Sequence, residues 1–569
     1  MQCLVLLNSE KEMKYLKKIK GDIVILTTSR IVAKQIKNSI YIDVFSNEYE
    51  ENLISETLIF FEKLQKYFSK EEYETYIYPN INMFYMKIIK PIFNVIEKMK
   101  EIIEFKEIEK IFLLGGNPKK EHIFFNFGEG ETIKSKFYER SYFLNYYIAM
   151  YFKHQEVIFL KTSHTNSIKF IERDILKLIR ILMIISKKKY RKLKKIKKEK
   201  KVVFHLRTST QQDTLKNLIL EAKKRQLKVY ELIDKNTISK PFNALTSKIE
   251  ILEFVSFKEI ILAIIKTLRT PKQNKNIQIK GIEFSIEEIR KELSIYYFEN
   301  LLKKMSYKNI FSKSDILVNT EVINQRAACD VLFTIEKNVK VYTIQHVLFG
   351  FYNLPKYDWS REIFCWDIST SKELNKLNSV DTFSYLGPTM YDNYYNSYKQ
   401  ANKKLKYCIF TQPDSFSKDY KVILREINKL KTDKIEFFLK LHPRDTIKNY
   451  RENMSNITLI EGTIDEILTK IDLTISIHSS VLNQSIIVGV PTLTLHGSID
   501  DYMKSVKEAE FLKYCYFLNF NFDMKKILDS NFIFHKSQEL RKKYLEKNIP
   551  GYTGNATQKI ANKIYNIQK

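Results

Sequence analysis

The sequence predicts an α/β protein built on parallel sheets, and three observations support that prediction. Short apolar runs alternate with helical segments between Lys406 and Gly497, a pattern typical of parallel βαβ units. A similar alternation recurs in the preceding residues. The chain of 569 residues, 44% of them hydrophobic, is too long for one core and predicts several folded domains. Ligands of such sheets bind outside the carboxyl ends of the strands.

The charge balance is strongly basic. Lys and Arg number 95 against 66 Asp and Glu, which gives a net charge of +29. This excess predicts a negatively charged partner: nucleotide phosphates, an anionic lipid surface or nucleic acid. The five cysteines are scattered without a CxxC pair, which favours reduced thiols over disulfides or a zinc framework.

The first residues, MQCLVLLNSEKE, lack a basic segment before the apolar run, so no secretion signal is expected. No stretch is long and apolar enough to predict a transmembrane helix. The expected location is cytoplasmic, with the inner membrane face as a candidate docking surface.

Residues 1–165 are expected to form an N-terminal α/β domain. Strands are predicted at 2–8, 22–28, 39–45, 110–116, 122–128 and 156–162, and helices at 49–70 and 83–108. The segment FGEGET places Glu129 on a turn flanked by glycines, where a carboxylate can reach a ligand. The alternative is an ordinary surface turn with glycine at positive φ.

Residues 166–201 are expected to link this domain to the next. Residues 170–186 are helical and apolar over a wide face, and residues 187–201 hold eleven Lys or Arg and one Glu. One interpretation is an interfacial helix with a polybasic patch on anionic lipid. Another is a solvated helix joining two domains, with its apolar face buried. Nucleic acid is a third, although no base-reading motif accompanies the run.

Residues 202–400 are expected to form a second α/β domain. Strands are predicted at 202–209, 227–233, 315–321, 339–346 and 362–367, and helices at 256–268 and 285–305. His346 ends one of these strands, a position from which an imidazole can serve as general base. A lone histidine can equally be structural.

Residues 401–569 are expected to form the third α/β domain. Its strands lie within 406–413, 435–445, 456–463 and 472–497, its first helix lies near 418–431, and an amphipathic helix within 551–566 can pack back across the domain junction.

The segment KLHPRD ends a predicted strand with a His-Pro pair. Pro443 has no N–H and fixes its φ, so the chain must leave the sheet there. His442 is then held at the mouth of the sheet, flanked by Lys440 and Arg444, where an imidazole can contact a phosphate. The alternative is that His-Pro merely ends the strand.

The segment HSSVLNQSIIVGVP supplies a second candidate site. Ser479 or Ser480 fits the N-cap of a helix whose free N–H groups and positive dipole end can bind phosphate. The alternative is an ordinary capped helix without a ligand. Between the two segments come a strand ending at Glu461 and a capping box from Thr463 to Glu466.

This order of motifs resembles the nucleotide-sugar domain of GT-B glycosyltransferases that build bacterial capsule and surface polymers. The resemblance extends to sialyl- and polysialyltransferases, Kdo transferases and CDP-glycerol glycerophosphotransferases, over roughly residues 202–569. It implies two Rossmann-like domains that face a cleft, an acceptor side at 202–400 and a donor side at 401–569, with the N-terminal α/β domain added.

The resemblance also implies roles for the donor-side residues. His442 and Pro443 would lie beside the cytidine phosphate or ribose, and Ser479 and Ser480 beside the phosphate. Related proteins often have Glu where Gln484 stands, contacting the donor ribose.

At both candidate bases this sequence differs from the motifs of the families that it resembles. Glu129-Gly130 resembles the second half of the acidic-acidic-Gly motif of bacterial sialyltransferases, with Gly128 in place of the first acidic residue. The stretch around His346 resembles the polymer transferases, but Val347 follows the histidine where those have Gly.

The expected function is therefore a glycosyltransferase, inverting and independent of metals and cofactors. It would move a sugar from a nucleotide-activated donor, with CMP-sialic acid or a related CMP-sugar as best guess, to a surface glycan or lipid-linked glycan. His346 is the first choice for base and Glu129 the second. The alternatives are a CDP-glycerol-type transferase, a sugar-nucleotide epimerase of the same architecture, or a non-catalytic basic protein that binds nucleic acid or lipid.

Overall fold

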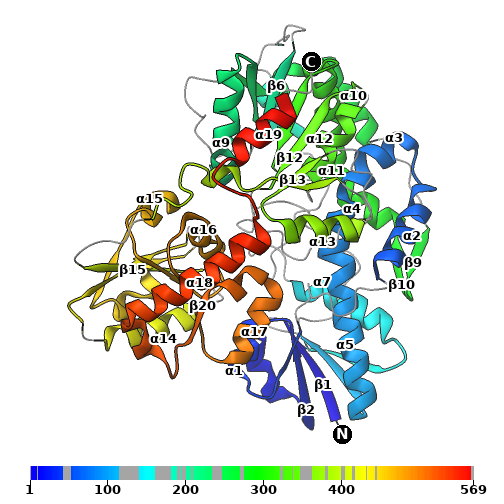
Figure 1. The fold of residues 1–569 in the computed structure, drawn as a ribbon. Helices are drawn as coiled ribbons and strands as arrows, with labels where there is room; N and C mark the ends of the chain where they lie inside the picture. Colours follow the sequence, from blue (N-terminus) through cyan, green and yellow to red (C-terminus); the bar gives the residue numbers. More distant parts are fainter. Residues whose placement is uncertain are drawn as a thin grey trace.

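The computed structural model describes the chain except for residues 1, 9, 43–52, 115–139, 161–180, 189–192, 194–199, 207–208, 234–246, 269–274, 321–324, 336, 346–361, 379–381, 399–403, 413–416, 431, 443–444 and 566–569. Three parallel sheets occupy successive parts of the chain, and each is the centre of one unit (Figure 1). The predicted α/β class is confirmed: the three sheets are consistent with two Rossmann-like domains of the GT-B type and one extra α/β unit.

The N-terminal unit has a five-stranded sheet in the order β3-β2-β1-β4-β5. Its strands are β1 (Gln2–Leu7), β2 (Asp22–Thr27), β3 (Ile40–Tyr41), β4 (Lys110–Leu114) and β5 (Glu156–Leu160). Its helices are α1 (Arg30–Gln35) and α7 (Arg140–Tyr151), with a 3₁₀ helix at Glu10–Lys18. Five of the predicted strands are confirmed, and the sixth, at 122–128, lies outside the described residues together with Glu129.

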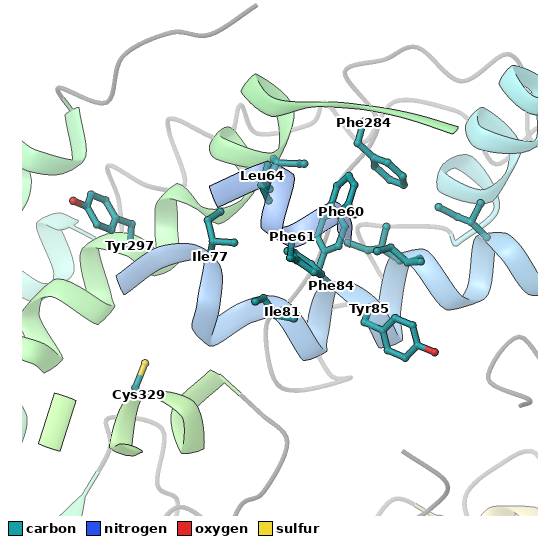
Figure 2. Close-up of a cluster of buried hydrophobic side chains, with 14 of the residues drawn as sticks. Phe60, Phe61, Leu64, Ile77, Ile81, Phe84, Tyr85, Phe284, Tyr297 and Cys329 are labelled. Atoms are coloured by element: carbon teal, nitrogen blue, oxygen red, sulfur yellow. The ribbon is translucent and has the colours of Figure 1, made fainter. Parts of the chain in front are cut away.

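The helices after β3 join the N-terminal unit to the middle unit. They are α2 (Leu53–Gln65), α3 (Lys70–Glu72), α4 (Ile81–Phe84) and α5 (Lys90–Lys106). The ring of Phe284 lies 5.5 Å from that of Phe60 and 5.8 Å from that of Phe84 (Figure 2). The Asn300 amide donates to the Thr75 carbonyl at 2.9 Å. The two units therefore share one continuous apolar core, which the sequence did not predict.

The middle unit has a seven-stranded sheet in the order β14-β13-β12-β11-β6-β7-β8. Its strands are β6 (Lys201–Leu206), β7 (Lys228–Ile233), β8 (Ser247–Glu250), β11 (Ile316–Asn319), β12 (Lys340–Ile344), β13 (Ile363–Cys365) and β14 (Phe383–Tyr385). Its helices are α9 (Ser209–Lys224), α10 (Phe257–Leu268), α11 (Ile286–Ile310), α12 (Gln325–Ile335) and α13 (Ile368–Asn378). A separate antiparallel hairpin, β9 (Asn276–Ile279) and β10 (Ile282–Ser285), precedes α11.

The C-terminal unit has a six-stranded sheet in the order β17-β16-β15-β18-β19-β20. Its strands are β15 (Leu405–Phe410), β16 (Ile435–Lys440), β17 (Ile457–Leu459), β18 (Leu473–Ser476), β19 (Thr492–His496) and β20 (Tyr516–Asn519). Its helices are α14 (Ser417–Asn428), α15 (Ile464–Leu468), α16 (Ser480–Val488), α17 (Ile499–Glu508) and α18 (Ser530–Asn548). The capping box from Thr463 to Glu466 is confirmed at the start of α15.

The last helix, α19 (Ala556–Tyr565), returns to the middle unit, where it lies among that unit's green elements (Figure 1). Ile560 and Ile564 are buried in one cluster with Phe204 of β6. The Asp392 carboxylate caps α19 by accepting from the N–H of Thr557 at 2.6 Å. Gly554 is required in the turn before α19, because its φ is +77° and a Cβ there would meet the Asp392 carbonyl oxygen at 2.8 Å.

The basic run at 187–201 is not uniformly solvated. Lys188 and Lys201 are buried. The Lys188 ammonium donates to the Leu252 carbonyl at 3.0 Å, and the Lys201 ammonium forms an ion pair with Asp315 at 2.7 Å. Lys201 is therefore neutralised within the fold, and Lys188 is held by a backbone carbonyl. In the described part of the chain, no helix is both long and apolar enough to cross a bilayer.

Candidate functional site

The order of strands reverses between β15 and β18 in the C-terminal sheet. β16 and β17 lie on one side of β15, and β18, β19 and β20 lie on the other. Connections diverge at such a point, and ligands of open α/β sheets bind there, outside the carboxyl ends of the strands. Thr411 and Gln412 follow β15, His442 follows β16, and Ser479 follows β18. Strands are spaced roughly 5 Å apart, so the ends of β16 and β18 lie roughly 10 Å apart with β15 between them.

His442 is fixed by its backbone. Its N–H donates to the Thr411 hydroxyl at 2.9 Å, and its carbonyl accepts from the N–H of Asp445 at 2.8 Å. Asp445 in turn accepts from the Tyr450 hydroxyl at 2.7 Å. Burial lowers the pKa of the His442 imidazole, and the nearby Asp445 carboxylate opposes that shift. The imidazole is therefore neutral near neutral pH. It lies at the carboxyl end of β16.

The ends of β15 and β18 are joined by Gln412. Its Oε1 accepts from the N–H of His478 at 2.8 Å, and its Nε2 donates to the carbonyl of the same residue. The Tyr420 hydroxyl of α14 donates to the Phe410 carbonyl at 2.8 Å and lies 2.9 Å from the Ser476 hydroxyl. Both strand ends are thus held in place before any ligand arrives, which lowers the ordering cost of binding.

The N-terminus of α16 faces the same edge of the sheet. Ser479 is its N-cap, as predicted, and its hydroxyl accepts from the N–H of Val481 at 3.4 Å. The N–H of Leu482 donates to the Ser479 carbonyl at 3.0 Å. The N–H of Ser480 is left to point out of the helix at its positive dipole end. Ser480 is exposed and Gln484, one turn further along, is half-buried. Residues four apart share a helix face, so these two polar side chains lie on the same side of α16.

Two other predicted donor residues lie further from the reversal point. Lys440 is the half-buried last residue of β16. Glu461 is exposed and follows the edge strand β17, so it lies at the rim of the sheet, one strand beyond His442. Pro443 and Arg444 lie outside the described residues.

The two candidate bases, His346 and Glu129, also lie outside the described residues. The middle unit instead contains a buried polar cluster around Asp330, below the carboxyl edge of its own sheet. The Asp330 carboxylate lies 2.7 Å from His205 and 3.1 Å from the Lys303 ammonium. Burial would raise the pKa of Asp330, but its interactions with His205 and Lys303 outweigh burial and hold the pKa well below its usual range. Because all three side chains are buried, we assign the cluster to the packing of α11 and α12 on the sheet.

One pair of carboxylates spans the middle and C-terminal units. Asp465 of α15 and Asp213 of α9 interact electrostatically. Burial, with Asp213 as the next largest cause, raises the pKa of Asp465 to about 6, and Lys216 opposes the shift. Like charges are thus held close where the two units approach each other.

Sequence reasoning missed the residues that build the site around the predicted ones. Thr411, Gln412 and Tyr420 bond to residues 31, 66 and 56 positions away, respectively. A local pattern did exist for the first two, because the polar pair Thr-Gln directly follows an apolar strand and precedes a proline.

The arrangement offers amide N–H groups, hydroxyls and one neutral imidazole to an anionic group. Such fixed dipoles stabilise the charge that develops on a leaving phosphate. Among the residues that the structure describes, no three His, Cys, Asp or Glu side chains group in a way that could hold a metal ion.

No family model matches the chain, and no curated protein matches its sequence. Solved structures are similar at low sequence identity. The wall teichoic acid polymerase TagF, studied with CDPG, aligns at 13% identity over 70% of this chain and 98% of that chain, with a TM-score of 0.42. A glycosyltransferase from Rickettsia africae aligns at 12% identity over 65% and 100%, with a TM-score of 0.39. MnaA of S. aureus with UDP aligns at 13% identity over 64% and 96%, with a TM-score of 0.39.

Proposed function

We propose that this chain is a glycosyltransferase that moves a sugar from a nucleotide-activated donor, with a CMP-sugar as the first candidate, to a surface glycan acceptor. One observation carries the proposal. His442, Gln412 and the capped N-terminus of α16 all lie at the point where the strand order of the C-terminal sheet reverses. A nucleotide phosphate matches this set of donors because helix N-termini and backbone amides bind anions without a metal.

Each donor-side residue has a part in the proposal. The phosphate contacts the N–H of Ser480 and the hydroxyls of Ser479 and Ser480, and His442 lies on its other side. Gln484 contacts the ribose from the same face as Ser480. The exposed Glu461, with Lys440, Pro443 and Arg444, borders the nucleotide.

The acceptor hydroxyl loses its proton to a base, for which His346 is the first candidate and Glu129 the second. The reaction inverts the anomeric configuration in this scheme, because one direct displacement needs a single base. The chain works in the cytoplasm, at the inner membrane face where a lipid-linked glycan would be presented.

The test is titration calorimetry of the full chain with CMP, CDP, UDP and GDP. We expect at least one cytidine nucleotide to bind, and His442→Ala to weaken that binding about tenfold through loss of one contact to a charged group. His535→Ala is the matched control, because His535 is an exposed histidine on α18 and its loss should leave affinity unchanged. If none of the four nucleotides binds, the proposal is wrong.

Product analysis with the preferred donor then separates the reaction types. A transferase consumes donor in step with acceptor, whereas an epimerase converts the donor alone. If the chain transfers glycerol phosphate from CDP-glycerol and transfers nothing from CMP-sugars, its donor is an activated polyol and not an activated sugar.

A further inference from the structure

The outer face of α10 is apolar and exposed. Phe257, Ile261, Leu262 and Ile265 are 54%, 44%, 44% and 37% exposed. At 100° per residue these four positions fall within one side of the helix. The opposite side of α10 is also apolar and packs on α11, with Ile260 fully buried. A surface helix usually turns polar residues outward, so this outer face marks an interaction surface.

A second exposed apolar segment lies beside α10. Residues 181–188 are helical, and Leu182 and Met183 are 55% and 47% exposed. The Lys188 ammonium at the end of this helix donates to the carbonyl of Leu252 at 3.0 Å. Leu252 belongs to the 3₁₀ helix Ile251–Phe254 that directly precedes α10. We call these two outer faces together the α10 surface.

The charge on the α10 surface is positive. Lys258 and Lys187 are exposed within it. Glu259 is the one acidic residue of the two helices, and it caps α10 by accepting from the N–H of Ser256 at 2.6 Å. Within the basic run at 187–201, Lys200 is also exposed, whereas Lys188 and Lys201 are buried.

We propose that the α10 surface docks on an anionic lipid bilayer, with α10 parallel to the membrane plane and Phe257, Ile261 and Ile265 inserted at the headgroup boundary. Apolar side chains on one face with cations beside them are what an interfacial helix needs, and each Lys near an anionic surface adds to the attraction. A second copy of the chain fits less well, because two basic surfaces of a +29 chain repel each other.

The inference rests on the proposed function in one respect: docking would hold the middle unit, as acceptor side, against a lipid-linked acceptor. The docking itself can be measured without any reaction. Its failure can therefore be told apart from failure of nucleotide binding.

The experiment is co-sedimentation of the full chain with vesicles of equal parts phosphatidylcholine and phosphatidylglycerol. The variant is Phe257→Ala with Ile261→Ala and Ile265→Ala, and its partition into the vesicle pellet should fall at least roughly tenfold. The matched control is Phe522→Ala in the C-terminal unit, whose side chain is 84% exposed; its partition should stay as in the unmodified chain. Circular dichroism and a nucleotide titration of the triple variant should be unchanged.

A second variant tests the charge. Lys187→Gln with Lys258→Gln should weaken binding to the mixed vesicles several-fold and reduce its salt dependence, with little effect on pure phosphatidylcholine. The inference is overturned if the unmodified chain does not bind the mixed vesicles, or if the triple variant binds them as well as the control does. It is also overturned if sedimentation shows that the triple substitution dissociates a dimer while lipid binding persists, because a second copy then covers the face.

Discussion

The side-chain amide of Gln412 is bonded twice to the backbone of His478. Oε1 accepts from the His478 N–H at 2.8 Å, and Nε2 donates to the His478 carbonyl. Gln412 follows β15 and His478 follows β18, the two neighbouring strands at which the order of the sheet reverses. The geometry of the candidate phosphate site therefore depends on one amide side chain that need not touch the ligand.

Gln412→Ala should weaken nucleotide binding about tenfold. The substitution removes both bonds to the His478 backbone, and each such hydrogen bond contributes roughly 0.5–1.5 kcal/mol. Calorimetric titration measures the affinity. Gln412→Glu retains the acceptor, but its carboxylate would face the His478 carbonyl and repel a bound phosphate, so affinity at least as low as that of Gln412→Ala is expected. Gln558→Ala, an exposed glutamine on α19, is the control; equal affinity in all three variants would contradict the prediction.

Nucleotide affinity should rise as the pH falls through 6.5, the ordinary pKa of the His442 imidazole. Burial holds the pKa of this group below that value in the free protein, and a bound phosphate stabilises the imidazolium, so binding takes up a proton. Proton uptake is measured by titrating in buffers of different ionisation enthalpy. The nucleotide phosphate itself takes up some of the protons. His442→Asn should abolish the proton uptake beyond that amount, whereas His535→Asn should retain it.

Asp465→Asn should stabilise the protein near neutral pH. The native pKa of Asp465 is raised from 3.8 to about 6, so the native state holds a proton that the unfolded chain has released. Stability therefore falls as pH rises through this window and stays lower above it. Because the side chain is partly exposed, the gain from the substitution is about 1 kcal/mol after solvent screening.

Chemical denaturation across this pH range tests the prediction for Asp465. The variant should show a flatter dependence of unfolding free energy on pH than the unmodified chain. Asp500→Asn on α17, at an exposed position, is the control. A variant that is less stable near neutral pH would show that Asp465 stabilises the contact between the units.

Ile560→Ala should lower the free energy of unfolding by about 2–4 kcal/mol. Ile560 is fully buried in the cluster that α19 shares with β6 and α9, and truncation of such a side chain leaves a cavity. Gln558→Ala, two residues earlier and exposed, should change stability by no more than about 0.5 kcal/mol. Equal losses for both variants would contradict the packing of α19 on the middle unit.

Local features of the fold were predictable because their partners are close in sequence. The Ser479 cap and the Thr463–Glu466 box involve residues two or three positions apart, and the strands follow from short apolar runs. Long-range features were not predictable from one sequence. Lys201 belongs to a run of lysines, yet it pairs with Asp315, 114 residues away. Nothing in the local pattern distinguishes it from Lys200, which is exposed.

The shared core of the N-terminal and middle units was not predictable for the same reason, because its contacts join residues far apart in the sequence. Phe60 and Phe84 belong to the helices predicted at 49–70 and 83–108, which were assigned to the N-terminal domain. They contact Phe284, a residue of a hairpin some 200 positions later. Periodicity shows which face of a helix is buried, but it does not show which part of the chain buries it.

The position of α19 also has a consequence for synthesis. Phe204 of β6 is translated more than 300 positions before Ile560, Ile564 and Tyr565, which complete its cluster. The middle unit therefore cannot complete its core until α19 has emerged, although its strands emerge long before. A chain truncated before α19 would expose the apolar residues of this cluster, and chaperones and proteases act on such exposed apolar surface.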